Sequence, residues 1–333
     1  MLKLNHIYEG HSEKILRDFP DNCIDCCVTS PPYYGLRNYG HSDQIGLEKT
    51  PEIYIANLVA VFEQVRRVLK PDGTLWLNLG DSYAGSTMTG GTKSFDGDGN
   101  KDKSRMFKKN LTTPTNCKPK DLIGIPWLVA FALRAAGWYL RSDIIWHKPN
   151  PMPESVTDRP TKSHEYIFLL SKSQTYYYDA DAIKENSTTQ ENRPHGVVRD
   201  RVYNYDSKQK VLREQRGYKN LQDNGQQNHS MHEKRLDPDN VEDYPVRNKR
   251  SVWTVTTKPY KDAHFATFPP ELIIDCIKAG CPPGGIVLDP FSGANTTGIT
   301  ARKLGRNYVS IELNPKYIQM SKNREEKELG LLI

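Results

Sequence analysis

The chain has 333 residues, of which 37% are hydrophobic and 26% are charged, and its mean hydropathy is −0.69. No apolar run approaches the roughly 20 residues of a membrane-spanning helix, and the N-terminal segment lacks the basic-then-apolar layout of a signal peptide. These features exclude an integral membrane protein and lead us to expect a cytoplasmic one. The 46 Lys and Arg residues exceed the 40 Asp and Glu residues, a balance that permits an anionic partner.

The cysteines do not predict a metal centre. Cys23 and Cys26 have the spacing of a zinc-binding pair, but no second pair and no nearby pair of histidines completes a tetrahedral site. Cys26 and Cys27 also lie in an apolar run, where cysteine is a small buried residue. We therefore expect no metal.

Secondary structure in the first half follows from apolar periodicity and turn residues. Thr50 and Pro51 mark the start of a helix, and Lys70-Pro71-Asp72-Gly73 marks its end. We expect strands at 23–29, 74–79, 139–146 and 165–170, and helices at 51–69 and 126–136.

Two stretches lack such periodicity. Residues 83–120 are rich in Gly, Ser and Lys, and we expect a mobile loop there. Between 187 and 250 only 14 of 64 residues are hydrophobic, whereas 13 are Lys or Arg and 10 are Asp or Glu. A segment this polar cannot form much core alone, so it is a loop-rich insert or a module that orders on a partner.

The globular pattern returns at Trp253. We expect a helix from Pro270, strands at 286–288 and 308–311, a helix ending near Leu304 and a last helix from Pro315. Strands that alternate with helices predict an α/β fold with a doubly wound, mostly parallel sheet. We divide the chain into an N-terminal half of one domain at 1–180, a polar insert at 181–252 and a C-terminal half of the same domain at 253–333.

The segment Asp289 to Gly298 joins a buried strand to a helix, and Glu312 ends the next strand. In doubly wound folds ligands bind at the carboxyl ends of strands, where an acidic residue can bind ribose hydroxyls. A dinucleotide loop needs a glycine where Asn295 stands, so we expect Asn295 to obstruct a pyrophosphate and Asp289 to repel it. A nucleoside with a positive centre, S-adenosylmethionine, fits this loop better.

A second loop, from Thr29 to Gly35, follows the first strong strand. Its two prolines stiffen the backbone and remove two N–H donors, which leaves carbonyl oxygens as fixed acceptors. With the Ser30 hydroxyl and the Tyr33 ring, such a loop suits a planar base that bears an amine. Acceptors bind the amine hydrogens and direct the lone pair toward an electrophilic methyl group. A polyproline-type loop without function is the alternative for this motif alone.

Three motifs together carry a family resemblance: TSPPY at 29–33, HFATFP at 264–269 and DPFSGANTTG at 289–298. Their combination and order resemble the amino-group DNA methyltransferases of the permuted β group over residues 5–180 and 253–325. The resemblance implies a Rossmann-like methyltransferase fold with a circularly permuted motif order, in which the N-terminal half is catalytic and the C-terminal half binds S-adenosylmethionine.

The resemblance also implies roles for individual residues. Ser30, Pro31, Pro32 and Tyr33 are the catalytic residues that hold the target base. The residues implied to bind S-adenosylmethionine are Thr29, Phe265, Thr267, Asp289, Phe291, Ser292, Gly293, Thr296 and Glu312, with Glu312 as the ribose ligand. Further residues that complete the base pocket are Asp81, Trp146 and Lys148.

The chain departs from the family pattern at two positions. The family often has a Gly-Asp pair where this sequence has Gly10-His11, and glycine where Asn295 stands. In addition, Asp158-Arg159 and His164-Glu165 recur in similar sequences, although a structural cluster of ion pairs is an equally good interpretation.

The implied reaction is methyl transfer to an exocyclic amine of a nucleotide flipped out of double-stranded DNA. In this family Ser-Pro-Pro-Tyr more often accompanies cytosine N4 and Asp-Pro-Pro-Tyr adenine N6, so we expect cytosine N4, with adenine N6 as the alternative. Methylation at cytosine carbon 5 is disfavoured because no Pro-Cys pair is present. A methyltransferase for a small-molecule or protein amine, and a catalytically silent DNA-binding protein, remain open.

We expect the insert at 181–252 to recognise the DNA target through its basic and tyrosine side chains, although a solvated variable loop is the simpler interpretation. A cognate restriction endonuclease is a candidate partner. Both a monomer and a homodimer are compatible with the sequence.

Overall fold

The computed structural model describes residues 2–36, 41, 43–85, 116–186, 246–258 and 268–330. Its contacts divide the chain into two units, Met1–Lys184 together with Asn248–Ile333, and Glu185–Arg247. The first unit contains the main sheet and the helices that cover it. Within the described ranges, no helix is both long and apolar enough to cross a membrane.

The described part of the first unit forms one eight-stranded sheet in the order β1-β10-β9-β2-β3-β5-β4-β8. Neighbouring strands are parallel except for β5, which is antiparallel to both β3 and β4. The strands are β1 His6–Glu9, β2 Ile24–Thr29, β3 Leu69–Leu79, β4 Tyr139–His147, β5 His164–Ser171, β8 Val252–Thr254, β9 Ile286–Asp289 and β10 Asn307–Glu312. The expected mostly parallel α/β sheet is confirmed.

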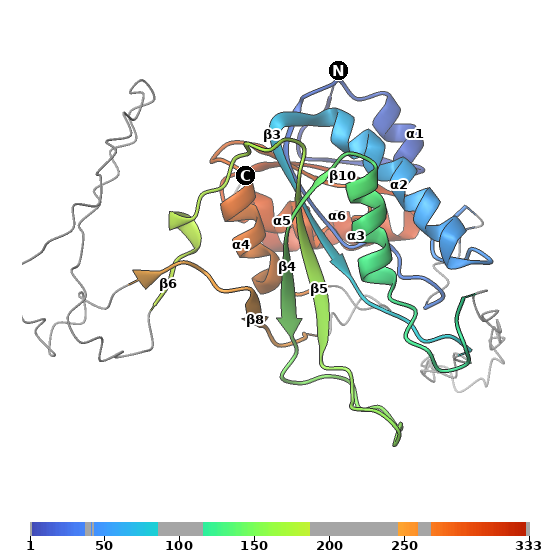
Figure 1. Ribbon diagram of the computed structural model, residues 1–333. Helices are drawn as coiled ribbons and strands as arrows, with labels where there is room; N and C mark the ends of the chain where they lie inside the picture. Colours follow the sequence, from blue (N-terminus) through green and yellow to red (C-terminus); the bar gives the residue numbers. More distant parts are fainter. Residues whose placement is uncertain are drawn as a thin grey trace, which may run out of the picture. The chain divides into compact units, whose positions relative to one another are not determined.

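Helices cover both faces of this sheet (Figure 1). On one face α2 contacts α1 and α3, and on the other α5 contacts α4 and α6. The helices are α1 Ser12–Arg17, α2 Pro51–Val68, α3 Ile125–Ala135, α4 Pro270–Gly280, α5 Thr296–Lys303 and α6 Pro315–Leu329, with a short 3₁₀ turn, η1, at Asp181–Ile183. This arrangement is doubly wound, as the alternation of elements predicts.

The central strands are mostly apolar in residues 24–29 of β2 and 74–79 of β3, where both faces of the sheet are buried. Side chains alternate across a strand, so Cys27 and Leu75 pack under α1, α2 and α3, whereas Cys26 and Trp76 pack under α4 and α5. Near-continuous apolar runs are typical of strands covered on both sides. Cys26 and Cys27 are fully buried, with free thiols whose pKa is raised by burial.

The structure differs from the expected elements at β3 and at the shortest segments. Strand β3 begins at Leu69, five residues before the expected start, because Leu69 pairs with Ile24 of β2 across a register shift. This irregularity accommodates the turn-like residues 70–73. The structure also contains β1, α1 and β8, elements of three to six residues that are not among those expected from the sequence.

The described residues of the second unit form a short antiparallel pair, β6 Glu185–Asn186 and β7 Val246–Arg247. Most of the insert expected at 181–252 lies outside the described residues, as does the centre of the loop expected at 83–120. At the described ends of that loop, the N–H of Ala84 donates to the carbonyl of Asp121 at 2.8 Å.

Candidate active site

The carboxyl ends of three parallel strands meet at one edge of the sheet. Strand β9 lies between β10 and β2. Glu312 ends β10, Asp289 ends β9 and Thr29 ends β2, so residues from opposite ends of the chain become neighbours. Doubly wound sheets bind their ligands at this edge. We refer to residues 289–296 as the Asp289 loop and to residues 30–36 as the Ser30 loop.

Asp289 connects the two loops. Its carboxylate is 2% exposed and accepts hydrogen bonds from the hydroxyls of Thr29 at 2.7 Å and Thr297 at 2.6 Å. The N–H of Phe291 also donates to it at 3.0 Å. Burial raises the pKa of the Asp289 carboxyl, and these three donors oppose that shift. The bond to Thr29 joins the Asp289 loop to the strand that leads into the Ser30 loop.

Both carboxylate oxygens of Glu312 accept backbone hydrogen bonds, from Gly293 and from Asn314, each at 2.8 Å. Burial raises the pKa of this carboxyl to about 7, and the charge of Asp289 adds to the rise. An ionised carboxylate has about four lone-pair sites, so Glu312 can accept further donors. Hydroxyls of a ribose are donors of this kind.

Two buried polar atoms near this edge have no hydrogen-bond partner in the described ranges, His11 Nδ1 and Ser292 Oγ. His11 follows Gly10, whose N–H donates to the carbonyl of Glu312 at 3.0 Å. Ser292 lies in the Asp289 loop and is 6% exposed. Because buried polar atoms in folded proteins are nearly always hydrogen-bonded, both atoms are candidates for contact with a ligand.

Helix α6 supports the Asp289 loop through hydrogen bonds of Ser321, Arg324 and Glu325. The hydroxyl of Ser321 donates to the carbonyl of Gly293 at 2.8 Å. Arg324, which is buried, donates to the carbonyl of Ala294 at 3.0 Å and to the hydroxyl of Thr296 at 2.8 Å. A rigid planar guanidinium is well suited to bridging two such acceptors.

Asn295 explains one departure from the family pattern. Its φ of 54° is left-handed, a conformation that asparagine tolerates, and its fully buried side chain accepts from Ser310 at 2.7 Å and donates to Glu325 at 3.0 Å. The amide is therefore bound to β10 and α6, and the obstruction of a pyrophosphate by Asn295 stays a prediction. A Cβ at Gly298 would lie 2.4 Å from Asn295 Oδ1, so this packing requires glycine at 298.

The Ser30 loop presents an acceptor at its start. Pro31 is buried, and its carbonyl receives no hydrogen bond from the described part of the chain. The carbonyl of Pro32, in contrast, accepts from the hydroxyl of Tyr54 at 2.8 Å. Ser30 Oγ lies 3.4 Å from the hydroxyl of Tyr33. Ser30 and Pro31 are therefore the acceptors left at this end of the loop.

Tyr33 reaches across two neighbouring strands. Its hydroxyl lies 2.7 Å from Glu165 Oε2 at the start of β5 and 3.1 Å from Asn78 Oδ1 near the end of β3. Glu165 in turn forms an ion pair with Lys148, which follows β4. The Ser30 loop is thus connected to the ends of three strands.

The three weaker sequence predictions lie in different surroundings. Asp81 accepts hydrogen bonds from three backbone N–H groups at 2.9 to 3.0 Å, two of them at the start of α3. Trp146 is 4% exposed and donates to the carbonyl of Val255 at 2.8 Å. Lys148 contacts the network of Tyr33 through Glu165, and its Nζ lies 4.3 Å from the centroid of the Trp146 ring. A base-pocket role for Asp81 and Trp146 remains a prediction, and their contacts support structural functions.

Sequence reasoning missed three residues of the site, namely Asn78, Thr297 and Arg324. Asn78 is the polar residue of the otherwise apolar segment 75–79, and this could have signalled it. Arg324 forms an ion pair with Glu328 one turn later, a pattern that reads as a solvated helix surface. Phe265 and Thr267 lie outside the described residues.

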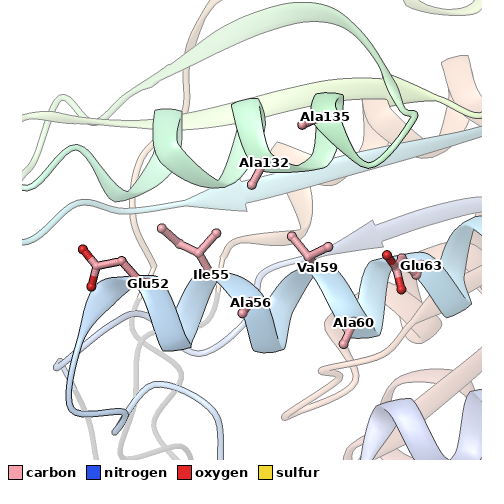
Figure 2. Close-up of a pocket in the computed structure, with 8 residues that line it drawn as sticks. All are labelled: Glu52, Ile55, Ala56, Val59, Ala60, Glu63, Ala132 and Ala135. Atoms are coloured by element: carbon pink, nitrogen blue, oxygen red, sulfur yellow. The ribbon is translucent and has the colours of Figure 1, made fainter.

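A shallow groove of about 530 Å³ lies between α2 and α3 (Figure 2). It is lined by apolar side chains, with Glu52 and Glu63 on its α2 wall: Ile55, Ala56, Val59 and Ala60 of α2, and Ala132 and Ala135 of α3. None of these residues belongs to the Asp289 loop or the Ser30 loop, so the groove is separate from the site.

The fold defines a class: a doubly wound α/β protein in which a strand-to-helix loop and a proline-rich loop lie side by side at the carboxyl ends of parallel strands. A family model described as DNA methylase matches residues 24–323. The chain is 42% identical to the type II methyltransferase M.Cfr9I of Citrobacter freundii over 322 residues, which cover 97% of this chain and 88% of that protein. It is also 42% identical to M.SmaI of Serratia marcescens, covering 96% and 89%. The chain belongs to this family of N4 and N6 amino-group DNA methyltransferases.

Solved structures share the fold. The cytosine-N4-specific PvuII DNA methyltransferase aligns over 98% of this chain and 90% of its own, with a TM-score of 0.59 and 18% identity. TTHA0409 of Thermus thermophilus, solved in complex with S-adenosyl-L-methionine, aligns over 97% and 95%, with a TM-score of 0.55 and 22% identity.

Proposed function

We propose that this chain is a site-specific DNA methyltransferase that transfers a methyl group from S-adenosylmethionine to the exocyclic N4 amine of a flipped-out cytosine. The observation that carries the proposal is the hydrogen bond between Thr29 and Asp289. It joins the loop suited to an amine-bearing base to the loop suited to a nucleoside. Donor and acceptor of the methyl group then meet at one edge of the sheet.

S-adenosylmethionine fits the residues at this edge. Glu312 accepts the ribose hydroxyls and attracts a positive centre, and the Ser292 hydroxyl, buried without a partner in the described ranges, offers a further contact. The other residues that would surround the cofactor are Phe291, Gly293 and Thr296 of the Asp289 loop and Thr29 at the end of β2. When bound, S-adenosylmethionine supplies a methyl group that is electrophilic because it is attached to a positively charged sulfur.

The Ser30 loop prepares the amine. Ser30 Oγ and the Pro31 carbonyl accept the two amine hydrogens, which directs the nitrogen lone pair away from the ring of the base. Pro32 fixes the loop through Tyr54, and the ring of Tyr33 stacks on the base. Flipping a nucleotide costs a few kcal/mol of lost stacking and pairing, and this stacking offsets part of that cost.

The choice of cytosine N4 rests on Ser30 and on the relatives. The Ser-Pro-Pro-Tyr form of the motif accompanies cytosine N4 more often than adenine N6 in this family, and PvuII methyltransferase, which shares the fold, is cytosine-N4-specific. Adenine N6 methylation would use the same geometry, because both bases present an exocyclic amine beside a ring nitrogen.

DNA recognition is assigned to the insert at 181–252, whose lysines, arginines and tyrosines suit phosphate and base contacts. The chain would then act on DNA in the cytoplasm of a prokaryotic or phage-infected cell. The type II names of the relatives favour a pairing with a restriction endonuclease of the same specificity.

The raised pKa of Glu312 makes cofactor binding depend on pH. The ionised carboxylate accepts hydroxyls and attracts the sulfonium more strongly than the neutral acid does, so affinity falls as the pH drops through about 7. Between pH 8 and pH 6 we expect the dissociation constant of S-adenosylmethionine to rise about tenfold, as measured by calorimetry. The variant Glu312→Gln should bind weakly at both pH values, and an unchanged pH dependence in this variant would assign the effect to another group.

Nucleoside mass spectrometry tests the proposed function directly. The protein is incubated with labelled S-adenosylmethionine and unmethylated DNA, and the DNA is then digested to nucleosides. We expect label in N4-methylcytosine. Label in N6-methyladenine would overturn the choice of base while keeping the site. Tight cofactor binding without label in DNA would favour a small-molecule or protein amine as the substrate.

A further inference from the structure

A cluster of polar side chains lies at the ends of β3, β4 and β5, where the proposed function does not require it. Glu165 stands at its centre. One carboxylate oxygen, Oε2, lies 2.7 Å from the Tyr33 hydroxyl and 3.3 Å from Asn78 Nδ2. The other oxygen forms an ion pair with Lys148. Donors therefore occupy both oxygens of this carboxylate.

Because donors already bind both of its oxygens, Glu165 is suited to holding neighbouring side chains and not to accepting a proton. The Glu165 and Lys148 side chains are only 16% and 18% exposed, and each neutralises the other. A carboxylate whose oxygens already accept three donors is a poor general base, because taking a proton would cost it those hydrogen bonds. Its function is therefore to hold the groups that it binds.

The ring of Tyr33 is confined on a second side by the backbone. A Cβ at Gly80 would lie 2.5 Å from Tyr33 Cε2 and 2.9 Å from Cδ2. The ring thus packs against β3 just after its last residue, Leu79, while its hydroxyl is held by Glu165. Asn78 completes the arrangement, because its amide donates to the carbonyl of Tyr166 at 3.1 Å as well as to Glu165.

We propose that Glu165, itself held by Lys148, is a positioning residue that fixes the orientation of the Tyr33 ring for stacking on the flipped base. This inference rests on the proposed function and adds to it a residue that does not touch the base. Without the anchor, the ring turns about its side-chain bonds when a base presses on it. The base is then bound, but its amine is misdirected.

The test uses the full-length protein and the variants Glu165→Gln, Tyr33→Phe and their combination. Each is measured for kcat and KM on unmethylated plasmid DNA, for S-adenosylmethionine affinity by calorimetry, and for thermal unfolding. We expect each single change to lower kcat about tenfold, because a misoriented ring loses part of the stacking free energy on the base. The KM for S-adenosylmethionine should not change. The double variant should be no slower than the slower single variant, because Tyr33→Phe removes the contact that Glu165→Gln weakens by removing the charge of its acceptor.

The control is Asp275→Asn on α4. Asp275 forms a similar half-buried ion pair, with Lys249, at 2.6 Å, but contacts neither loop, so its kcat should equal that of the wild type. The inference is overturned if Glu165→Gln keeps the wild-type kcat, or if the fold-loss in kcat of the double variant equals the product of the two single losses. It is also overturned if Glu165→Gln loses both kcat and cofactor affinity because its fold is less stable. A wild-type protein that labels no DNA would instead refute the proposed function.

Discussion

Replacing Asp289 by alanine is expected to lower the affinity for S-adenosylmethionine at least about 100-fold. The change leaves the hydroxyls of Thr29 and Thr297 and the N–H of Phe291 without their acceptor. An unsatisfied buried donor costs about 1–3 kcal/mol, so the Asp289 loop rearranges or remains strained. Calorimetric titration of the folded variant measures the loss, and normal affinity would refute the assignment of this loop.

Asp25 supplies the matched control, because it is also a buried aspartate on a central strand. Its carboxylate binds Lys70 Nζ at 2.6 Å and the N–H of Ile286 at 2.8 Å, near the opposite end of β2. We expect Asp25→Ala to lower the midpoint of thermal unfolding as Asp289→Ala does. Only Asp289→Ala should lose the cofactor, which separates damage to the fold from damage to the site.

Replacing Tyr33 by alanine is expected to lower kcat/KM for DNA about 5- to 150-fold. Stacking of a base on an aromatic side chain contributes about 1–3 kcal/mol, which corresponds to this range. Cofactor affinity should not change, because Tyr33 contacts β3 and β5 rather than the Asp289 loop. Steady-state methylation of plasmid DNA checks the first expectation and calorimetry the second.

Tyr139 is the control for this change. It is 45% exposed at the start of β4, the end of the strand opposite Lys148, so Tyr139→Ala should keep the wild-type kcat/KM. If Tyr33→Ala turned over as fast as this control, base stacking would have to reside in another aromatic residue.

The long elements of the fold could be predicted from the sequence because each contains its own signal. Helix α2 begins after Thr50, whose side chain accepts from the N–H of Ile53, and its apolar face is periodic over 18 residues. Strand β1 has four residues and no such signal. It exists because it pairs with β10, a contact between opposite ends of the chain that no local pattern records.

The two parts of the site likewise differ in how far the sequence could predict them. The Asp289 loop is one continuous segment, so its motif could be read directly and linked to Glu312 at the next strand end. The cluster around Tyr33 draws on the ends of three further strands, and its members are 45 to 132 residues from Tyr33 in sequence. For Glu165 the sequence leaves a functional motif and a structural ion pair equally open; Glu165 pairs with Lys148, and only the fold brings this pair to the Ser30 loop.

The hydrogen bonds from α6 make this helix a support of the Asp289 loop. Every strand of the described sheet ends before Pro315, so a protein truncated at that point would keep all of them. It would lose Ser321, Arg324 and Glu325, which hold four consecutive residues of the Asp289 loop, 293–296. A stop codon between positions 315 and 321 would therefore leave every strand of the described sheet intact and remove all the hydrogen bonds between α6 and the Asp289 loop.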